Sequence, residues 1–589
     1  MDYSLDTFAA QVKQAIAATG RVPEAQIEVV APKPNIPADL AFPAFRAAKE
    51  LGVNPAQLAQ ELAAAIQIAP ESLIGSVSAA GPFLNFALKP ELFATSVLGE
   101  VHSMGKRYGS DDLGKGQTII IDYSSPNIAK TMHVGHIRST IIGQALHNIF
   151  SALGYNALGD NHLGDWGKQF GVNIAAIVKW GKPEAEGEEA IAQIDKLYAE
   201  YNRLLKAALE QGDSSYDDEA RSWSLKLEQG DPTARELWQW MVDLTIQANQ
   251  TNYDRLGVSF DHIFGESFYA GMTDGVIQEA LDQGVAYRDE AGAVVVSELE
   301  KNMPTFLLQR SDTGTLYHTR DAATIKFRWS EFHPAQIIYV VDARQELHFR
   351  QLFALSRAMG YVPPEVALTH IKFGTVFDQN GDVLSTRKGN MVYLSDLLNE
   401  AHSRARAVVD QASQDLSEAE KEKIAEAVGI GAVIYNDLYQ DPRRDIRLDW
   451  DKMLALEGNS APYIQYMNAR CRSILRKAAE EEAGLGRRSS ADQAEYAALL
   501  VHPAEQALAK QLAKLPDAVR EAGVRYATFV IAEWCYETAR ALAGFYRDCS
   551  VLKAETPELR AARLYLVAAT AQALENGLGL LGVRAPERM

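Results

Sequence analysis

The sequence contains little cysteine, no long apolar run and comparatively few positive charges. Its 589 residues include only three cysteines, Cys471, Cys535 and Cys549, which are too few for a disulfide framework and lack the spacing of a zinc site. No apolar stretch is long enough to cross a bilayer, and the N-terminus has neither the basic region nor the apolar core of a secretory signal. These absences predict a protein of the reducing cytoplasm without a membrane anchor.

The charge balance restricts the class of partner. Lysine and arginine total 58 against 77 aspartate and glutamate residues, so the formal net charge is −19. The footprint of a nucleic-acid-binding protein is usually basic. An RNA-binding function would therefore require basic side chains gathered on one face of an otherwise acidic molecule. The length predicts about three or four domains rather than one core.

One stretch of the sequence predicts a phosphate site. Thr118–Ile121 is β-branched and apolar, like a buried strand, and apolar residues recur at helical spacing from Ile137 to Ile149. His133-Val-Gly-His136 then lies on the first turn of the helix, where unpaired N–H groups and the helix dipole favour an anion. Gly135 lets a base or ribose approach the backbone closely. These groups, with a positive charge from Lys130, could hold a triphosphate and stabilise charge during its transfer.

Two histidines three apart also suit a surface pair or half of a metal site. No cysteine, histidine or carboxylate cluster nearby completes a set of metal ligands. A strand leads into the turn, and Asn127 and Lys130 precede the pair. This context favours the nucleotide interpretation, and no dedicated metal site is predicted.

Several motifs resemble those of one enzyme family. Ser125-Pro-Asn-Ile-Ala-Lys-Thr-Met-His-Val-Gly-His136 is similar to the H-x-G-H signature of class I aminoacyl-tRNA synthetases, in its arginyl-tRNA synthetase form. His162-Leu-Gly-Asp-Trp-Gly-Lys-Gln-Phe-Gly171 resembles another segment of that family. Gly389-Asn390 aligns with the end of the second class I signature, K-M-S-K-S-x-G-N. Glu457–Tyr466 and Arg584–Met589 resemble the family's anticodon-binding domain.

The second signature departs from the class pattern. Val383 and Thr386 stand where the signature has lysines, which bind ATP phosphates. Arginyl-tRNA synthetases often carry instead a lysine before the first histidine, which here is Lys130. Arg387 and Lys388 could also neutralise the pyrophosphate.

The resemblance implies a multidomain α/β fold. A small α+β N-terminal domain that contacts tRNA would span 1–110. A Rossmann-type catalytic domain would span 111–390 with a helical insertion at about 181–252, and an all-α anticodon-binding bundle would span 391–589. Individual expected elements include strands at Asn156–Asp160, Ile337–Val341 and Ala367–Phe373, a hairpin of Thr305–Gln309 with Leu316–Thr319, a hairpin tip at Asp378–Asp382, and helices at Leu40–Leu51, Glu189–Gln211, Ala220–Glu228, Thr233–Asn252, Leu394–Gln411, Glu418–Leu438, Met453–Glu481, Ala491–Leu515, Arg520–Cys549 and Pro557–Leu581.

The resemblance also implies the site residues. A guanidinium is planar, always charged and suited to bidentate carboxylates, which Glu266 and Asp321 could supply. The arginine-binding set would be Asn127, Ser125, Asp165, Glu266, Tyr317, Asp321 and Gln345. ATP would be bound by Gly135, His133, His136, Lys130 and Gly389, with His133, His136, Lys130, Arg387 and Lys388 catalytic. Tyr463, Tyr466, Arg470 and Met589 would contact tRNA, the first three on an aromatic and basic helix face with Asn468, Arg472 and Arg476.

The implied reaction is ATP-dependent ligation of L-arginine to its cognate tRNA through an arginyl-adenylate. ATP would bring Mg²⁺ without a dedicated protein site. We expect a monomer, with arginine, ATP and tRNA as its partners and no membrane. Two alternatives remain open: an adenylyltransferase that uses the same histidine signature on a small acid, and a non-catalytic tRNA-binding relative, which the altered second signature favours.

Overall fold

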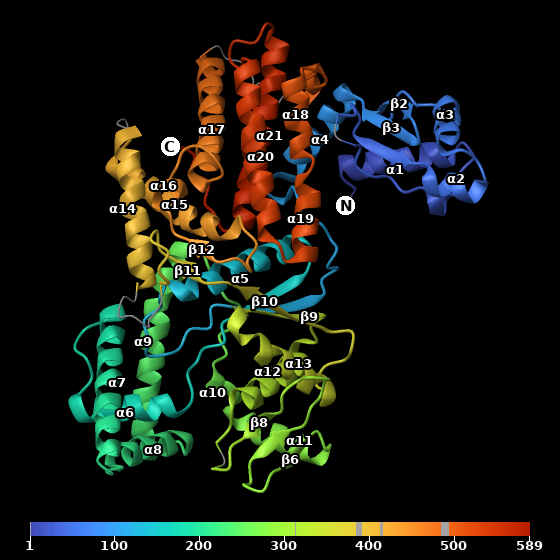
Figure 1. The fold of residues 1–589 in the computed structure, drawn as a ribbon. Helices are drawn as coiled ribbons and strands as arrows, with labels where there is room; N and C mark the ends of the chain where they lie inside the picture. Colours follow the sequence, from blue (N-terminus) through green and yellow to red (C-terminus); the bar gives the residue numbers. More distant parts are fainter. Residues whose placement is uncertain (1, 34, 313, 385–391, 413–415, 485–493) are drawn as a thin grey trace.

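The structure is a computed structural model that describes residues 2–33, 35–312, 314–384, 392–412, 416–484 and 494–589. Figure 1 shows a central parallel sheet with a helical bundle on one side and two lobes on the other. The N-terminal domain lies beside the bundle, away from the lobes.

The N-terminal domain is built on a small antiparallel sheet with the strand order β1-β3-β2. Its elements are α1 (Ser4–Ala17), β1 (Leu40–Pro43), α2 (Phe45–Leu51), α3 (Pro55–Ala65), β2 (Ile74–Ala80), β3 (Phe83–Leu88) and α4 (Pro90–Met104). The predicted helix Leu40–Leu51 is therefore wrong over its first four residues, which pair with β3 from Leu40 opposite Phe86. The apolar residues Leu40–Pro43 are compatible with a helix, but they pair with a neighbouring strand instead. Local propensity cannot predict such pairing.

The central sheet has four parallel strands in the order β10-β9-β4-β5. They are β4 (Thr118–Asp122), β5 (Asn156–Asp160), β9 (Gln336–Asp342) and β10 (Ala367–Phe373), and the four strands predicted from sequence are confirmed. Helix α5 (Val134–Ala152) connects β4 to β5, and α13 (Glu346–Ala358) connects β9 to β10. These two crossovers leave the middle of the sheet in opposite directions. The carboxyl ends of β4 and β9 therefore form a topological switch point, where ligands of open α/β sheets bind.

One lobe is the predicted helical insertion. It consists of α6 (Lys168–Trp180), α7 (Gly187–Glu210), α8 (Ser215–Glu228) and α9 (Pro232–Leu256). Helices α7, α8 and α9 correspond to the three predicted helices, although α7 ends one residue early, at Glu210. Helix α6 lies before residue 181, where the insertion was predicted to begin. Apolar contacts of α6 with α7 and α8 give the lobe its own small core.

The other lobe combines helices with a small antiparallel sheet, β6-β7-β8. Its elements are α10 (Glu266–Tyr269), α11 (Thr273–Asp282), β6 (Ala286–Arg288), β7 (Val294–Val296), β8 (Phe306–Gln309) and α12 (Tyr317–Phe332). The predicted strand Leu316–Thr319 is wrong, because only Thr315 bridges to Gln309 before α12 begins. Buried residues at helical spacing further along α12, such as Ala322 and Ile325, select the helix.

The C-terminal part is almost wholly helical. Its elements are α14 (Leu394–Ala412), α15 (Glu418–Leu438), α16 (Trp450–Met453), α17 (Ala461–Gly484), α18 (Pro503–Leu512), α19 (Leu515–Arg525), α20 (Thr528–Asp548) and α21 (Pro557–Leu580), with a short pair of β11 (Val376–Phe377) and β12 (Ile446–Arg447). The predicted continuous helix Arg520–Cys549 is wrong, because Tyr526 takes φ +53° and separates α19 from α20. Met453–Glu481 is likewise interrupted, since α16 ends at Met453 and α17 starts at Ala461. The stretch Ala491–Leu515 is also not one helix, because the helical residues described within it belong to separate elements.

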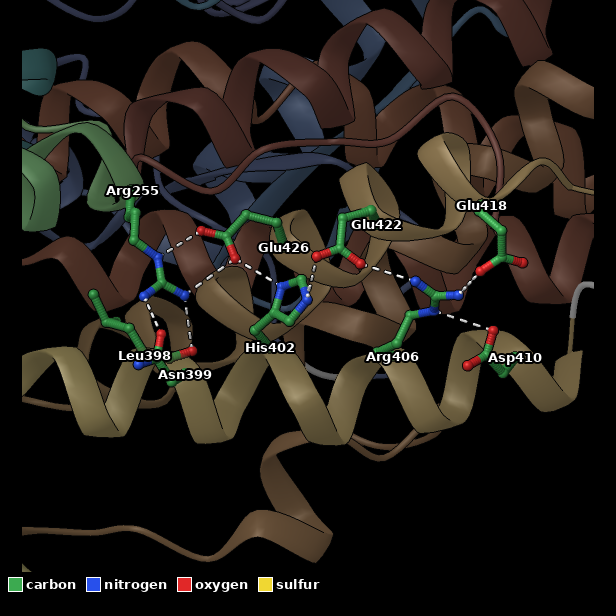
Figure 2. Close-up of polar contacts among 9 residues, drawn as sticks. All are labelled: Arg255, Leu398, Asn399, His402, Arg406, Asp410, Glu418, Glu422 and Glu426. Atoms are coloured by element: carbon green, nitrogen blue, oxygen red, sulfur yellow. Dashed lines mark hydrogen bonds and ion pairs between the residues drawn. The ribbon is translucent and has the colours of Figure 1, made fainter.

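Helices α14 and α15 pack side by side and share a row of charged side chains (Figure 2). His402 of α14 contacts Glu426 through Nδ1 (2.9 Å) and Glu422 through Nε2 (3.0 Å). Arg255, at the end of α9, reaches across to Glu426 with Nε at 2.8 Å. The row therefore connects the insertion to the helices that follow the central sheet.

Among the residues that the structure describes, no helix combines the length and the apolar character needed to cross a bilayer.

Candidate active site

The loop between β4 and α5 has a constrained backbone. Ser124, Ser125 and Ala129 have φ values of +70°, +49° and +61°. Side chains lack favourable space in this left-handed region, at a cost of roughly 1 kcal/mol or more per residue. Neighbouring elements hold the loop: the Ser125 amide donates to Asn161 (3.0 Å) and the Ala129 amide donates to Thr245 (3.1 Å). The loop shape is thus fixed by the surrounding fold.

The two histidines lie at the start of helix α5, as the sequence predicted, and there they cap the helix and lie against each other. The Gly135 amide donates to Nδ1 of His133 (3.0 Å), and the His133 amide donates to Nδ1 of His136 (3.1 Å). Their ring centres are 4.0 Å apart. Because Nδ1 accepts a hydrogen bond in both rings, each neutral ring carries its proton on Nε2.

The surroundings favour the neutral form of both rings. Burial and the charge of His133 lower the pKa of His136 to about 3. Burial, and then the charge of Lys130, lower the pKa of His133. At neutral pH the pair therefore offers two N–H donors rather than two cations. The Lys130 ammonium lies 5.6 Å from the centre of the Tyr198 ring on α7, and its side chain is exposed.

A cavity of about 380 Å³ lies beside Asp165, and a larger one, of about 930 Å³, lies at the switch point. The larger cavity is bordered by the start of α5 and by the ends of β9 and β10. Its lining residues are Asn127, His133, Gly135, His136, Arg138, Asp342, Arg344, Gln345, Phe373, Gly374, Thr375, Val376, Gly381, Asp382, Val383 and Leu384. Its volume and its helix N-terminus suit a nucleotide.

The second signature mostly lies outside the described residues. Thr386, Arg387, Lys388 and Gly389 belong to the segment 385–391. The predicted hairpin before it is confirmed, since the Asp378 amide donates to the Asp382 carbonyl (2.9 Å). After it, the Val134 amide donates to the Val392 carbonyl (3.1 Å). The described residues on both sides of the segment therefore lie beside the cavity or the first histidine.

Three predicted carboxylates gather near the same end of the sheet, and each has a partner. Asp165 accepts from the amide and hydroxyl of Ser267 (2.8 and 2.6 Å). Glu266 faces Nε of Arg320 at 3.3 Å. Asp321 contacts Nε2 of His348 at 2.6 Å. Charge on His162 acts on all three carboxylates as a smaller influence that favours their ionised form.

The three carboxyl groups differ in pKa. Burial raises the pKa of Asp165 and outweighs its hydrogen bonds from Ser267. Burial also raises the pKa of Glu266, although Arg320 opposes the effect. For Asp321, burial is again the largest influence, but the contributions of His348 and nearby cations together outweigh it, so its pKa is lowered.

The remaining predicted arginine-site residues lie around these carboxylates and the cavity. Asn127 and Gln345 are exposed and line the cavity. The Ser125 hydroxyl donates to Asp122 (2.9 Å) at the end of β4. Tyr317 is 63% exposed, at the start of α12. The structure thus places polar groups of the predicted set on both sides of the carboxyl ends of β4 and β9.

Sequence reasoning missed a buried ion triad beneath this site. Nη2 of Arg328 on α12 lies 2.6 Å from Asp122 and 2.6 Å from Asp160. The two aspartates end β4 and β5, and the arginine side chain is 1% exposed. Arg328 is far along the chain from both aspartates, so no local pattern in the sequence indicated this contact. The triad fixes the two strand ends that carry the histidine loop and the Asp165 loop.

The predicted RNA face on α17 is only partly exposed. Tyr466 is 40% exposed, and Arg470 lies 4.7 Å from the centre of the Tyr546 ring. Tyr463 is half-buried near Tyr536. Asn468 is 1% exposed, so its assignment to this face is wrong, because helical spacing turns it toward the core.

Two further residues of this region have partners near the C-terminus. Arg472 pairs with Glu575, and Arg476 donates to the carbonyl of Glu587 (3.1 Å). Met589 packs on a cluster between α14 and α15 that includes Ala405. The end of the chain is therefore attached to both α17 and the α14–α15 pair.

Among the described residues, no group of three histidine, cysteine or acidic side chains is arranged to hold a metal ion.

Three family models together match nearly the whole chain. They are "tRNA synthetases class I (R), catalytic domain" over 99–450, "DALR anticodon binding domain" over 464–589 and "Arginyl tRNA synthetase N terminal domain" over 6–88. The histidine site, the parallel sheet and these matches define a class I aminoacyl-tRNA synthetase.

Relatives specify the family. A protein of Chloroflexus aggregans named arginine–tRNA ligase is 62% identical over 589 residues, covering all of both chains, and one of Chloroflexus aurantiacus is 61% identical over 594. The solved arginyl-tRNA synthetase of Thermus thermophilus is 25% identical with a TM-score of 0.77, covering 99% of this chain and 100% of that one. That of Plasmodium falciparum, at 22% identity and a TM-score of 0.78, covers 99% of each chain and shares the fold. The chain belongs to the arginyl-tRNA synthetase family.

Proposed function

We propose that the chain activates L-arginine with ATP at the switch-point cavity and transfers it to a cognate tRNA. Family membership makes the overall reaction the ligation of arginine to tRNA. The observation that carries the detailed assignment is the neutral histidine pair, whose Nε2 donors lie at a helix N-terminus beside a cavity of nucleotide size.

In this proposal the ATP phosphates are bound by His133, His136 and the start of α5. Gly135 leaves room for the nucleotide, and Lys130 adds positive charge. Preorganised donors stabilise the charge that develops on the phosphates without reorganising during the reaction. Mg²⁺ accompanies ATP and supplies further charge neutralisation. Arg387, Lys388 and Gly389, outside the described residues, complete the proposed ATP site.

Arginine is assigned to the group of three carboxylates, of which Asp165 lines the smaller cavity. Glu266 and Asp321 attract its guanidinium, and Tyr317 supplies a hydroxyl and an aromatic edge. Asp165 orients an ammonium or a ribose hydroxyl. The polar groups that orient its amino and carboxyl ends are Asn127, Ser125 and Gln345. The arginine carboxylate then attacks the α-phosphate in line, releasing pyrophosphate. No protein nucleophile is needed, because positioning and charge stabilisation carry the step.

A terminal ribose hydroxyl of tRNA would next take the arginyl group from the adenylate. We assign tRNA contact to Tyr463, Tyr466, Arg470 and Met589, with further contact from the domain 1–110. The catalytic domain would span 111–390 and the anticodon-binding domain 391–589. We further propose a cytoplasmic monomer.

The test is arginine-dependent exchange of pyrophosphate into ATP, measured with and without cognate tRNA and with lysine as control. Lys130→Ala should reduce exchange about 100-fold, in the range of one lost charge-stabilising group. Lys301→Ala, which removes an exposed lysine outside the proposed site, should leave the rate unchanged. Exchange in Lys130→Ala at the wild-type rate would remove Lys130 from the site. No exchange by the wild-type protein under any condition would instead support the non-catalytic alternative.

A further inference from the structure

The proposed arginine site already contains a guanidinium group, that of Arg320. Nε of Arg320 lies 3.3 Å from Glu266, and its guanidinium carbon lies 5.0 Å from the centre of the Tyr317 ring. The positive charge also acts on Asp321, the next residue of α12. The side chain is only 10% exposed. The residues assigned to the substrate's guanidinium, Glu266, Tyr317 and Asp321, thus lie around the guanidinium of Arg320, which belongs to the chain itself.

The contact between Arg320 and Glu266 is incomplete. Nε of Arg320 is buried and makes no hydrogen bond among the described residues. A strong arginine–carboxylate pair instead forms two parallel N–H···O bonds. Asp321 and Asp165 are better satisfied, by His348 at 2.6 Å and by Ser267 at 2.6 and 2.8 Å. Glu266 is therefore the carboxylate of this group whose partner is held least firmly.

Glu266 nevertheless requires a positive partner. Its side chain is 12% exposed, and a buried carboxylate without a cation or hydrogen-bond donors is strongly disfavoured. A second guanidinium cannot take the same place, because two like charges at that distance repel each other. Binding of the substrate's guanidinium at the Glu266 oxygen that faces Arg320 (Oε2) therefore requires Arg320 to move away.

We propose that Arg320 is an internal competitor of the substrate: it neutralises Glu266 and is displaced when arginine binds. This inference rests on the proposed arginine-binding role of Glu266. Only molecules in which Arg320 has left Glu266 can bind a ligand. The apparent affinity of every ligand of the site is therefore lowered by the same factor, which is the fraction of the protein in that state. Arg320 thus sets the concentration at which the site fills, and the preference for arginine over lysine is set by the other contacts.

The experiment measures equilibrium binding of arginine and of lysine by calorimetry to wild type and to Arg320→Gln. The variant should bind both ligands about tenfold more tightly, by an equal factor. Arg350→Gln is the matched control, because it removes an exposed arginine of α13, whose partner is Glu300. It should bind both ligands like wild type. Unchanged or weaker binding of arginine by Arg320→Gln, or a changed ratio of the two affinities, overturns the proposal.

A second variant separates this inference from the proposed site itself. Glu266→Gln should bind arginine much more weakly than wild type. If Glu266→Gln binds arginine normally, the site assignment fails and the inference fails with it. If Glu266→Gln binds weakly while Arg320→Gln is not tightened, only the internal competition is refuted.

The wild-type protein offers a test that does not depend on how Arg320→Gln folds. The Arg320 Nε–Hε signal, assigned by its absence in Arg320→Lys, should shift when arginine saturates the site and should exchange faster with water. A signal unchanged at saturation shows that Arg320 stays in place and overturns the proposal.

Discussion

Gly135 separates the two histidines because no other residue fits beside the His133 ring. A Cβ atom at this position would lie 2.7 Å from Cε1 and 2.8 Å from Nδ1 of His133. Gly135→Ala should therefore displace the ring, break the hydrogen bond that fixes its tautomer and slow pyrophosphate exchange about 100-fold. The thermal unfolding midpoint should change little, because the position is exposed. Gly99→Ala on α4, where a Cβ meets open space, is the control. Wild-type exchange by Gly135→Ala would contradict the proposed role of this ring.

Glu266 makes a prediction about pH. Burial raises its pKa above the ordinary value of about 4.3, and the guanidinium of arginine binds only its ionised form. As the pH falls through that raised pKa, KM for arginine should rise while KM for ATP stays constant. Glu266→Gln should have a high KM for arginine that no longer depends on pH in this window. A parallel rise of both KM values in wild type would show that the group titrating is not specific to the arginine site.

At the scale of elements, the row of charges between α14 and α15 connects α9 to the rest of the molecule. Glu426 accepts from Arg255 and contacts His402, and both partners are about one-fifth exposed (Figure 2). Glu426→Gln should lower the free energy of unfolding by about 1–2 kcal/mol at pH 7, as expected for a lost charged hydrogen bond. Glu200→Gln, which removes an exposed pair with Arg203 on α7, should leave it unchanged.

The contacts of Glu426 with Arg255 and His402 also determine how the effect of Glu426→Gln on stability changes with pH. Burial would raise the pKa of Glu426, but Arg255 and His402 together lower it. A carboxyl group with a lowered folded-state pKa stabilises the fold above its unfolded value of about 4.3, and this contribution is lost as the pH falls through the folded pKa. The difference between wild type and Glu426→Gln should therefore shrink below about pH 4. A difference that persists there, in denaturant unfolding, would mean that packing rather than charge is responsible.

Helices and strands could be predicted from the sequence where the spacing of apolar residues is regular over a long stretch. The parallel strands and Glu418–Leu438 follow directly from apolar runs and helical spacing. The errors occur where a contact distant in sequence decides the outcome. Leu40–Pro43 becomes a strand only because β3 offers a partner, and the break occurs at Tyr526, which is neither glycine nor proline. Local sequence contains neither piece of information.

The same distinction between local and distant contacts applies to the site. The histidine turn could be predicted because a strand, a glycine and a helix follow one another within a single stretch. The partners of the carboxylates could not, since Arg320 meets Glu266 and Arg328 meets Asp122 only after folding. A charged residue in a sequence does not reveal whether it lies on the surface or between buried aspartates.

At the scale of the whole molecule, ion pairs connect the N-terminal domain to the C-terminal bundle. Arg520 of α19 contacts Asp6 (2.8 Å), and Lys510 of α18 pairs with Asp39. Arg520 also contacts Asp111, just after that domain, at 2.5 Å. These contacts hold the N-terminal domain in its place beside the bundle (Figure 1). Many basic side chains of this acidic chain are thus engaged internally, so RNA contact falls to those that remain exposed.

Tyr466 and Arg470 lie one helical turn apart on α17 and should contribute to tRNA binding by different physical means. Arg470→Gln should weaken binding and reduce the slope of log affinity against log salt by about 1, because one phosphate contact is lost. Tyr466→Ala should weaken binding by about 1–3 kcal/mol through lost base stacking, with the salt slope unchanged. The measurement is tRNA affinity at several salt concentrations, with Arg203→Gln on the insertion as the control. Equal salt slopes in Arg470→Gln and wild type would show that Arg470 makes no phosphate contact. Because stacking and charge respond differently to salt, the two variants together decide whether this face of α17 binds RNA.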